Sequence, residues 1–147
     1  MPGYLVVAIV ICCALLLVLF VYNLLVKRYR AVRERLQEKY PNPLFVEFSA
    51  NYMGSTDQSL MSLRGNGILV FDQNEMHFEM LAPTRTITIP YEAITGISTP
   101  RVFMGRSKLG KNLVVEYVGK NGEQVKSGWI VCNLDKAVEL LGEKKAS

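Results

Sequence analysis

Residues Gly105 to Asn112, with the sequence GRSKLGKN, differ at one position from a phosphate-binding loop. The pattern G-x-x-x-x-G-K-[ST] surrounds nucleotide phosphates with backbone N–H groups, and its last hydroxyl contacts a magnesium ion. Here Asn112 stands in place of that hydroxyl. Such a loop must also lead directly into a helix, whose positive end faces the phosphates. The following segment is NLVVEYV, which is typical of a strand, so we interpret the match as accidental.

Other groups with catalytic chemistry are few. His77 is the only histidine, so it has no second histidine with which to form a metal site. Cys132 is the only cysteine outside the apolar N-terminal segment, and as a nucleophile it would need His77 beside it as a base. No catalytic motif connects the two residues. We therefore expect a protein that is not an enzyme and uses no metal and no cofactor.

The segment of residues 100–112, PRVFMGRSKLGKN, has a different chemistry, because it contains four basic residues and no acidic one. Its apolar part could enter a membrane surface while the cations meet anionic headgroups. The alternative is a solvated loop whose Phe103 folds back onto the core. The candidate lipid-binding residues are Arg101, Phe103, Arg106, Lys108 and Lys111.

The N-terminal segment predicts a membrane anchor. Residues 4–26 contain no Asp, Glu, Lys, Arg or His. As a helix, this segment would be roughly 34 Å long, enough to cross a hydrocarbon core of about 30 Å. A cleaved signal peptide is the alternative, but it has a basic start, a shorter apolar core and a small-residue cleavage site. The chain begins with Met1-Pro2-Gly3 and lacks these features, so we expect residues 1–26 to be a transmembrane signal-anchor.

Charge predicts how this anchor is oriented. Residues 27–39 contain six basic and two acidic side chains, whereas the rest of the chain has eleven of each. Basic residues beside a membrane span are retained on the cytoplasmic side, so we expect the N-terminus outside and the C-terminal domain in the cytoplasm. The chain offers no intrachain disulfide framework, which agrees with a reducing compartment. The juxtamembrane basic residues are Lys27, Arg28, Arg30, Arg33 and Arg35.

The next segment, residues 27–43, is predicted to form a basic helical stalk. It contains good helix formers, with an apolar stripe at helical spacing, until Pro41 and Pro43 end the pattern. The stripe consists of Tyr29, Val32, Leu36 and Tyr40.

Residues 44–142 are predicted to form a mainly-β domain, followed by a tail of residues 143–147. Short alternating segments with aromatic and β-branched residues indicate about seven antiparallel strands, and NLDKAVELLG indicates a final helix. The Asn121-Gly122 pair marks one hairpin turn. Short connections favour a bent sandwich or split barrel with a C-terminal helix. The predicted strand segments include Ile68–Phe71, Met76–Leu81, 85–90, 91–98, 112–118 and 124–132.

Several of these segments resemble the pleckstrin-homology (PH) and GRAM-like superfold, in which seven strands form two bent sheets closed by a C-terminal helix. The resemblance lies in GNGILVF, MHFEM, ITIPYEAITGIS and the long segment from Asn112 to Leu141. Its most specific part is Ile-x-Ile-Pro-Tyr-x-x-Ile, from Ile87 to Ile94. An anchor with a basic collar and such a domain is also similar to uncharacterised bacterial membrane proteins with PH-like domains, which favours a bacterial inner membrane.

Phosphoinositide-binding members of this superfold have several basic residues in the loop after the first strand. The corresponding loop here has one arginine, Arg64, and one acidic residue, Asp57. The resemblance therefore does not imply that site, and the basic segment 101–111 is the better candidate for contact with lipid.

Together these observations predict a membrane-tethered, non-enzymatic binding or adaptor module that engages anionic lipid or a protein at the cytoplasmic membrane surface. The alternative is an accessory or structural subunit of a larger membrane complex, with a protein partner or a second copy bound through the transmembrane helix and the stalk. We expect no nucleic-acid binding, because the β-domain has no excess of basic residues.

Overall fold

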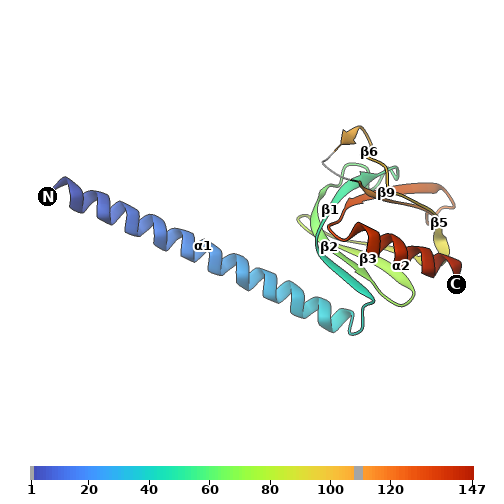
Figure 1. Cartoon of the computed structure of the whole chain (residues 1–147), viewed down its shortest axis with the longest axis horizontal. Coiled ribbons are helices and arrows are strands. Elements are labelled where there is room, and N and C mark those ends of the chain that lie inside the picture. The colour runs from blue at the N-terminus through green and yellow to red at the C-terminus, as the bar shows by residue number, and fades with distance from the viewer. Residues whose placement is uncertain (1, 108–110) are drawn as a thin grey trace. The chain divides into compact units, whose positions relative to one another are not determined.

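The computed structural model describes residues 2–107 and 111–147. The chain divides into two compact units, one ending at Asn42 and the other spanning Pro43–Ser147, which we call the β-domain. Figure 1 shows the elements of each unit, which are described separately below.

The first unit is a single helix, α1, from Gly3 to Lys39. Its 37 residues begin with the apolar run and continue without interruption through the basic segment. The most apolar window has a mean hydropathy of 3.3, and none of its residues is buried. The helix ends where the N–H of Tyr40 donates to the carbonyl of Leu36 at 2.8 Å, directly before Pro41. A helix this long, apolar and exposed is consistent with a membrane anchor or a signal sequence.

The β-domain contains a seven-stranded antiparallel sheet followed by a C-terminal helix, which confirms the predicted fold class. The strand order is β4-β3-β2-β1-β9-β8-β5. The strands are β1 (Phe45–Ser55), β2 (Gly65–Phe71), β3 (Glu75–Leu81), β4 (Thr84–Pro90), β5 (Ile94–Ser98), β8 (Leu113–Val118) and β9 (Gln124–Ile130). The helix is α2 (Leu134–Ala146), and one turn of 3-10 helix, η1 (Tyr91–Ala93), precedes β5.

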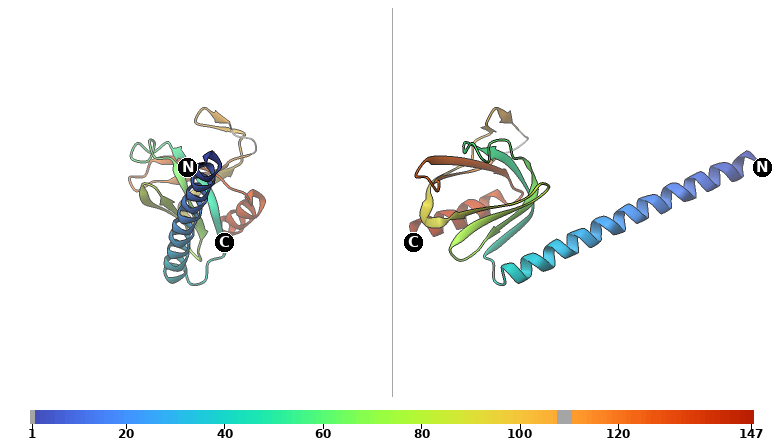
Figure 2. Two further views of the ribbon diagram at one scale, coloured as in Figure 1. Left: turned by 90° about the vertical axis from the view of Figure 1, so that its left-hand side faces the viewer. Right: turned by 180° about the vertical axis from the view of Figure 1, so that it is seen from behind.

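The sheet bends around one hydrophobic core, and α2 lies across its open side (Figure 2). Three fully buried aromatic residues form the centre of this core: the ring of Tyr52 lies 5.4 Å from that of Trp129 and 5.6 Å from that of Phe78. Helix α2 contributes Ala137 and Leu141, which are both completely buried. Every buried member of this cluster lies between Phe45 and Leu141, so the β-domain has a core of its own and we expect it to fold as a separate fragment.

A small group of buried hydroxyls lies within the same domain. The Ser127 hydroxyl lies 3.4 Å from the Tyr52 hydroxyl and 3.2 Å from that of Tyr117. Burial raises the pKa of Tyr52 to about 12 and also raises the pKa of Tyr117. Both phenols therefore stay protonated at neutral pH and can act as hydrogen-bond donors, which gives this group a structural role.

Candidate functional site

The basic segment forms a short β-hairpin that projects from the main sheet (Figure 1). Strand β6 (Val102–Phe103) pairs with β7 (Arg106–Ser107), with Val102 opposite Ser107 and Phe103 opposite Arg106. The two connecting residues both have positive φ, 50° at Met104 and 72° at Gly105. A two-residue loop with positive φ at both positions is a type I′ turn, the favoured connection of tight hairpins. None of the predicted strand segments includes these residues, so the hairpin is an element that the sequence did not predict.

Phe103 attaches this hairpin to the sheet. Its side chain is 9% exposed and packs with Met53 of β1 and Val114 of β8. A Cβ atom added to Gly128 of β9 would lie 2.5 Å from Phe103 Cδ1, so the ring lies directly on the glycine backbone. Of the two interpretations that the sequence left open, the structure shows the one in which Phe103 folds back, so its ring is not exposed at an apolar tip. The exposed apolar residue of β6 is its neighbour Val102, which is 55% exposed.

The basic residues of this segment remain at the surface. Arg101, Arg106 and Lys111 are exposed, whereas Lys108 lies outside the described residues. The cations lie on both sides of Val102 in the sequence, and no acidic residue occurs between residues 100 and 112. The structure therefore gives three accessible cations close in sequence to one accessible apolar side chain.

Asn112 has a structural role that its sequence position did not suggest. Its side chain is buried, and Nδ2 donates to the carbonyl of Pro100 at 3.1 Å and to that of Arg101 at 3.3 Å. Its backbone N–H also donates to the carbonyl of Pro100, at 3.0 Å. These bonds close the base of the hairpin segment, and the chain continues directly into β8. Since no helix follows, the phosphate-loop pattern has no structural counterpart here.

Phe103→Ala should separate the hairpin from the sheet without unfolding the β-domain. We expect a loss of about 2 kcal/mol in the free energy of unfolding of fragment 43–147, because Phe103 lies in a small satellite cluster. Urea denaturation followed by Trp129 fluorescence measures this loss. The exposed neighbour provides the control, since Val102→Ala should change stability by less than about 0.5 kcal/mol. Equal stability of the two variants would mean that the ring is not packed as described.

The predicted juxtamembrane cations form a second basic group. They lie on the part of α1 that follows its apolar run, and all are exposed: Lys27, Arg28, Arg30, Arg33 and Arg35.

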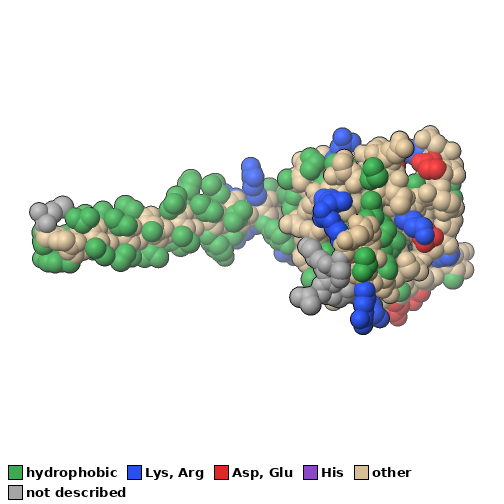
Figure 3. All heavy atoms as spheres, turned by 90° about the horizontal axis from the view of Figure 1, so that it is seen from above, with side chains coloured by type: hydrophobic (Ala, Val, Ile, Leu, Met, Phe, Trp, Pro, Cys, Tyr) green, Lys and Arg blue, Asp and Glu red, His purple; other side chains and the backbone are tan. Residues whose placement is uncertain are grey.

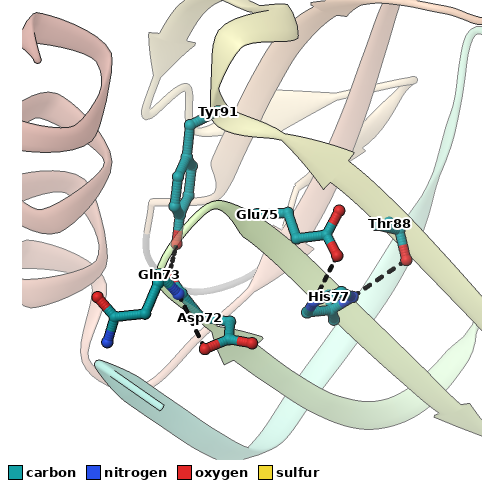
Figure 4. Close-up of polar contacts among 6 residues, drawn as sticks. All are labelled: Asp72, Gln73, Glu75, His77, Thr88 and Tyr91. Atoms are coloured by element: carbon teal, nitrogen blue, oxygen red, sulfur yellow. Dashed lines mark hydrogen bonds and ion pairs between the residues drawn. The ribbon is translucent and has the colours of Figure 1, made fainter. Parts of the chain in front are cut away.

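The polar contacts of His77 lie between neighbouring strands and turns (Figure 4). His77 is buried on β3, with Nδ1 3.1 Å from Thr88 Oγ1 and Nε2 3.4 Å from Glu75 Oε1. Nearby, the Tyr91 hydroxyl donates to the carbonyl of Asp72 at 2.8 Å. Burial raises the pKa of Tyr91, so this hydroxyl remains a donor. These contacts join β3 to β4 and hold the turn between β2 and β3.

Cys132 lies beside β1, at the start of α2. Its Sγ is 3.2 Å from Ser49 Oγ, and that hydroxyl donates to Glu47 Oε1 at 2.8 Å. The other oxygen of Glu47 accepts from the backbone N–H of Asn133 at 3.1 Å. The cluster therefore joins β1 to the residue that precedes α2. Within the described part of the chain, no three His, Cys, Asp or Glu side chains are placed to hold a metal ion.

Comparisons with known proteins show a similar fold in a solved structure but indicate no activity. No protein-family model matches the sequence, and no curated protein matches it. Among solved structures, the chain is similar to the C-terminal domain of an unknown protein from Leishmania infantum, with a TM-score of 0.53 and 12% sequence identity. The match covers 79% of this chain and 99% of that one. An identity this low indicates a shared fold alone.

Proposed function

We propose that this chain is a membrane-anchored, non-enzymatic binding module whose β-domain engages anionic lipid headgroups through the hairpin segment 101–111. The observation that carries the proposal is the set of three exposed cations close in sequence to the exposed Val102, in a segment with no acidic residue. Cations near an anionic bilayer surface contribute about 1 kcal/mol each, so a small group of them gives measurable binding.

The architecture supports this proposal in two ways. Helix α1 serves as a single-pass anchor, with the basic residues 27–39 retaining the β-domain on the cytoplasmic side, in our proposal at a bacterial inner membrane. The seven antiparallel strands with a C-terminal helix agree with the resemblance to PH and GRAM-like domains, many of which act by binding. Because α1 tethers the domain to the membrane, the local concentration of headgroups is high. A modest affinity of the hairpin for lipid is therefore enough to keep it bound to headgroups much of the time.

Charge reversal at Arg106 and Lys111 tests the proposal. We expect Arg106→Glu with Lys111→Glu to weaken binding of fragment 43–147 to anionic vesicles at least about 30-fold, because about 1 kcal/mol of attraction is lost at each position. The measurement is co-sedimentation with vesicles of phosphatidylcholine and phosphatidylglycerol.

A matched double variant controls for total charge. Arg85→Glu with Lys120→Glu makes the same charge change at two exposed positions outside the hairpin segment, on β4 and in the turn before β9. This variant should bind more tightly than the hairpin variant by about 10-fold. If the two variants lose the same amount of vesicle binding, only the net charge of the domain matters, and the hairpin is not the lipid-binding site.

A further inference from the structure

Two segments of the β-domain that are far apart in sequence meet at Gly54 of β1. One is the hairpin β6–β7, and the other is the loop of residues 56–64 between β1 and β2. A Cβ atom added to Gly54 would lie 3.4 Å from Met104 Sδ and 3.5 Å from the carbonyl oxygen of Met61. Gly54 has a φ of 127°, which side-chain-bearing residues rarely adopt. The backbone angle calls for glycine at this position, and the two distances, which are those of ordinary contacts, show that the hairpin and the loop both lie beside it.

Each of these segments has one exposed apolar side chain and, next to it in sequence, apolar side chains that pack against the rest of the domain. In the described part of the β-domain, the two most exposed large hydrophobic residues are Val102 at 55% and Met61 at 48%. In the loop, Leu60 and Leu63 pack against the main core. In the hairpin, Phe103 has the same anchoring role. The exposed side chains are therefore held at fixed positions and not on unattached loops.

The two segments carry an excess of positive charge. Four exposed cations lie in or beside the two segments: Arg64, Arg101, Arg106 and Lys111. The one acidic residue, Asp57, is half-buried, and its Oδ1 accepts from the backbone N–H and the hydroxyl of Ser59, each at 2.8 Å. Figure 3 views the side from which the hairpin projects, where Lys and Arg side chains, and some Asp and Glu side chains towards one edge, lie around a strip of hydrophobic side chains.

We propose that the loop and the hairpin form one membrane-inserting surface. In this surface Met61 and Val102 enter the boundary between headgroups and acyl chains, while the four cations contact anionic headgroups. A bilayer fits this surface better than a protein does. At a membrane interface, apolar side chains contact the acyl chains while neighbouring cations contact the anionic headgroups, and this surface offers both kinds of side chain. This inference rests on the proposed function and adds the loop of residues 56–64 to the lipid-binding surface.

Paired substitutions test the apolar part of the surface. Met61→Ser with Val102→Ser should weaken binding of fragment 43–147 to anionic vesicles by about 10-fold, since both buried apolar contacts are lost. The control is Leu81→Ser with Val118→Ser, which changes the two other exposed large hydrophobic residues among those described in the β-domain and should leave binding unchanged. An equal effect of both pairs would overturn the inserting role of Met61 and Val102.

A fluorescent probe tests insertion directly. Cys132 is the one cysteine of fragment 43–147, so Cys132→Ser with Met61→Cys allows a single nitrobenzoxadiazole label on the loop. On addition of anionic vesicles, the label should shift to shorter wavelength and be quenched by nitroxide lipids, whereas a label at Lys120→Cys should do neither. If the labelled fragment binds vesicles but the fluorescence of the label at residue 61 does not change, the inserting surface is overturned and the proposed function stays in place. Absence of binding by the unlabelled fragment would overturn both.

Discussion

Replacing Gly67 with alanine is expected to destabilise the β-domain by about 3 kcal/mol or more, among the larger effects of single substitutions. Gly67 lies on β2 opposite Met80 of β3. A Cβ atom at this position would lie 2.4 Å from the carbonyl oxygen of Glu79 and 2.5 Å from Phe78 Cζ. The first is backbone of a paired strand, and the second belongs to a fully buried ring, so neither can move without disturbing the sheet or the core.

Gly142 provides a matched control for this substitution. It lies in α2, and a Cβ atom added there would have no atom within 4 Å. Gly142→Ala should therefore stabilise fragment 43–147 by about 0.5–1 kcal/mol, since alanine loses less backbone entropy in a helix. Urea denaturation of the two variants, followed by Trp129 fluorescence, measures both changes. A Gly67→Ala variant as stable as the wild type would contradict the described register of β2 and β3.

Trp129→Ala should have a comparable or larger effect, with a loss of about 3–5 kcal/mol in the free energy of unfolding. The indole is completely buried, with its ring 5.4 Å from that of Tyr52 and 6.2 Å from that of Phe78. Removing it would leave a large cavity at the centre of the core. Because the substitution removes the fluorophore, far-UV circular dichroism in urea is the appropriate measurement.

The indole N–H of Trp129 makes Trp129→Phe an informative comparison. Within the described residues this buried donor has no hydrogen-bond acceptor, and an unsatisfied buried donor costs about 1–3 kcal/mol. Phenylalanine keeps most of the ring contacts and removes that cost, so its net loss should be less than half that of alanine. Equal losses for the two variants would indicate that the indole N–H contributes a stabilising contact.

Regular elements of this chain could be predicted because their signals are local. Alternation in RTITIP predicts β4, where Ile87 and Ile89 are buried and Thr86 and Thr88 are exposed. The Asn121-Gly122 pair predicts the turn before β9, and Gly122 has a positive φ of 82°, which glycine adopts without strain. Helical spacing in the last segment predicts the buried face of α2. In each case the pattern lies within a few neighbouring residues.

The candidate surface could be predicted only in part, since its geometry depends on distant contacts. Two-residue strands are too short to show alternation, and Met104-Gly105 is not one of the usual type I′ pairs. Whether Phe103 is exposed depends on Gly128, in a strand 25 residues later, because only a glycine leaves room for the ring. The hairpin and the loop meet beside Gly54 through Met104 and Met61, which are also far apart in sequence. The basic character of the segment was visible in the sequence, whereas the sequence did not show which of its apolar residues is exposed.

One measurement tests the lipid-binding proposal most directly: co-sedimentation of fragment 43–147 with phosphatidylcholine vesicles, with and without phosphatidylglycerol, at low and moderate salt. The proposal predicts sedimentation with the anionic vesicles alone, weakening as salt screens the exposed cations. Sedimentation that does not depend on anionic lipid, or none in either salt, would contradict it. The lipid contacts of this chain would then be confined to α1, and a subunit of a larger membrane complex would become the better hypothesis.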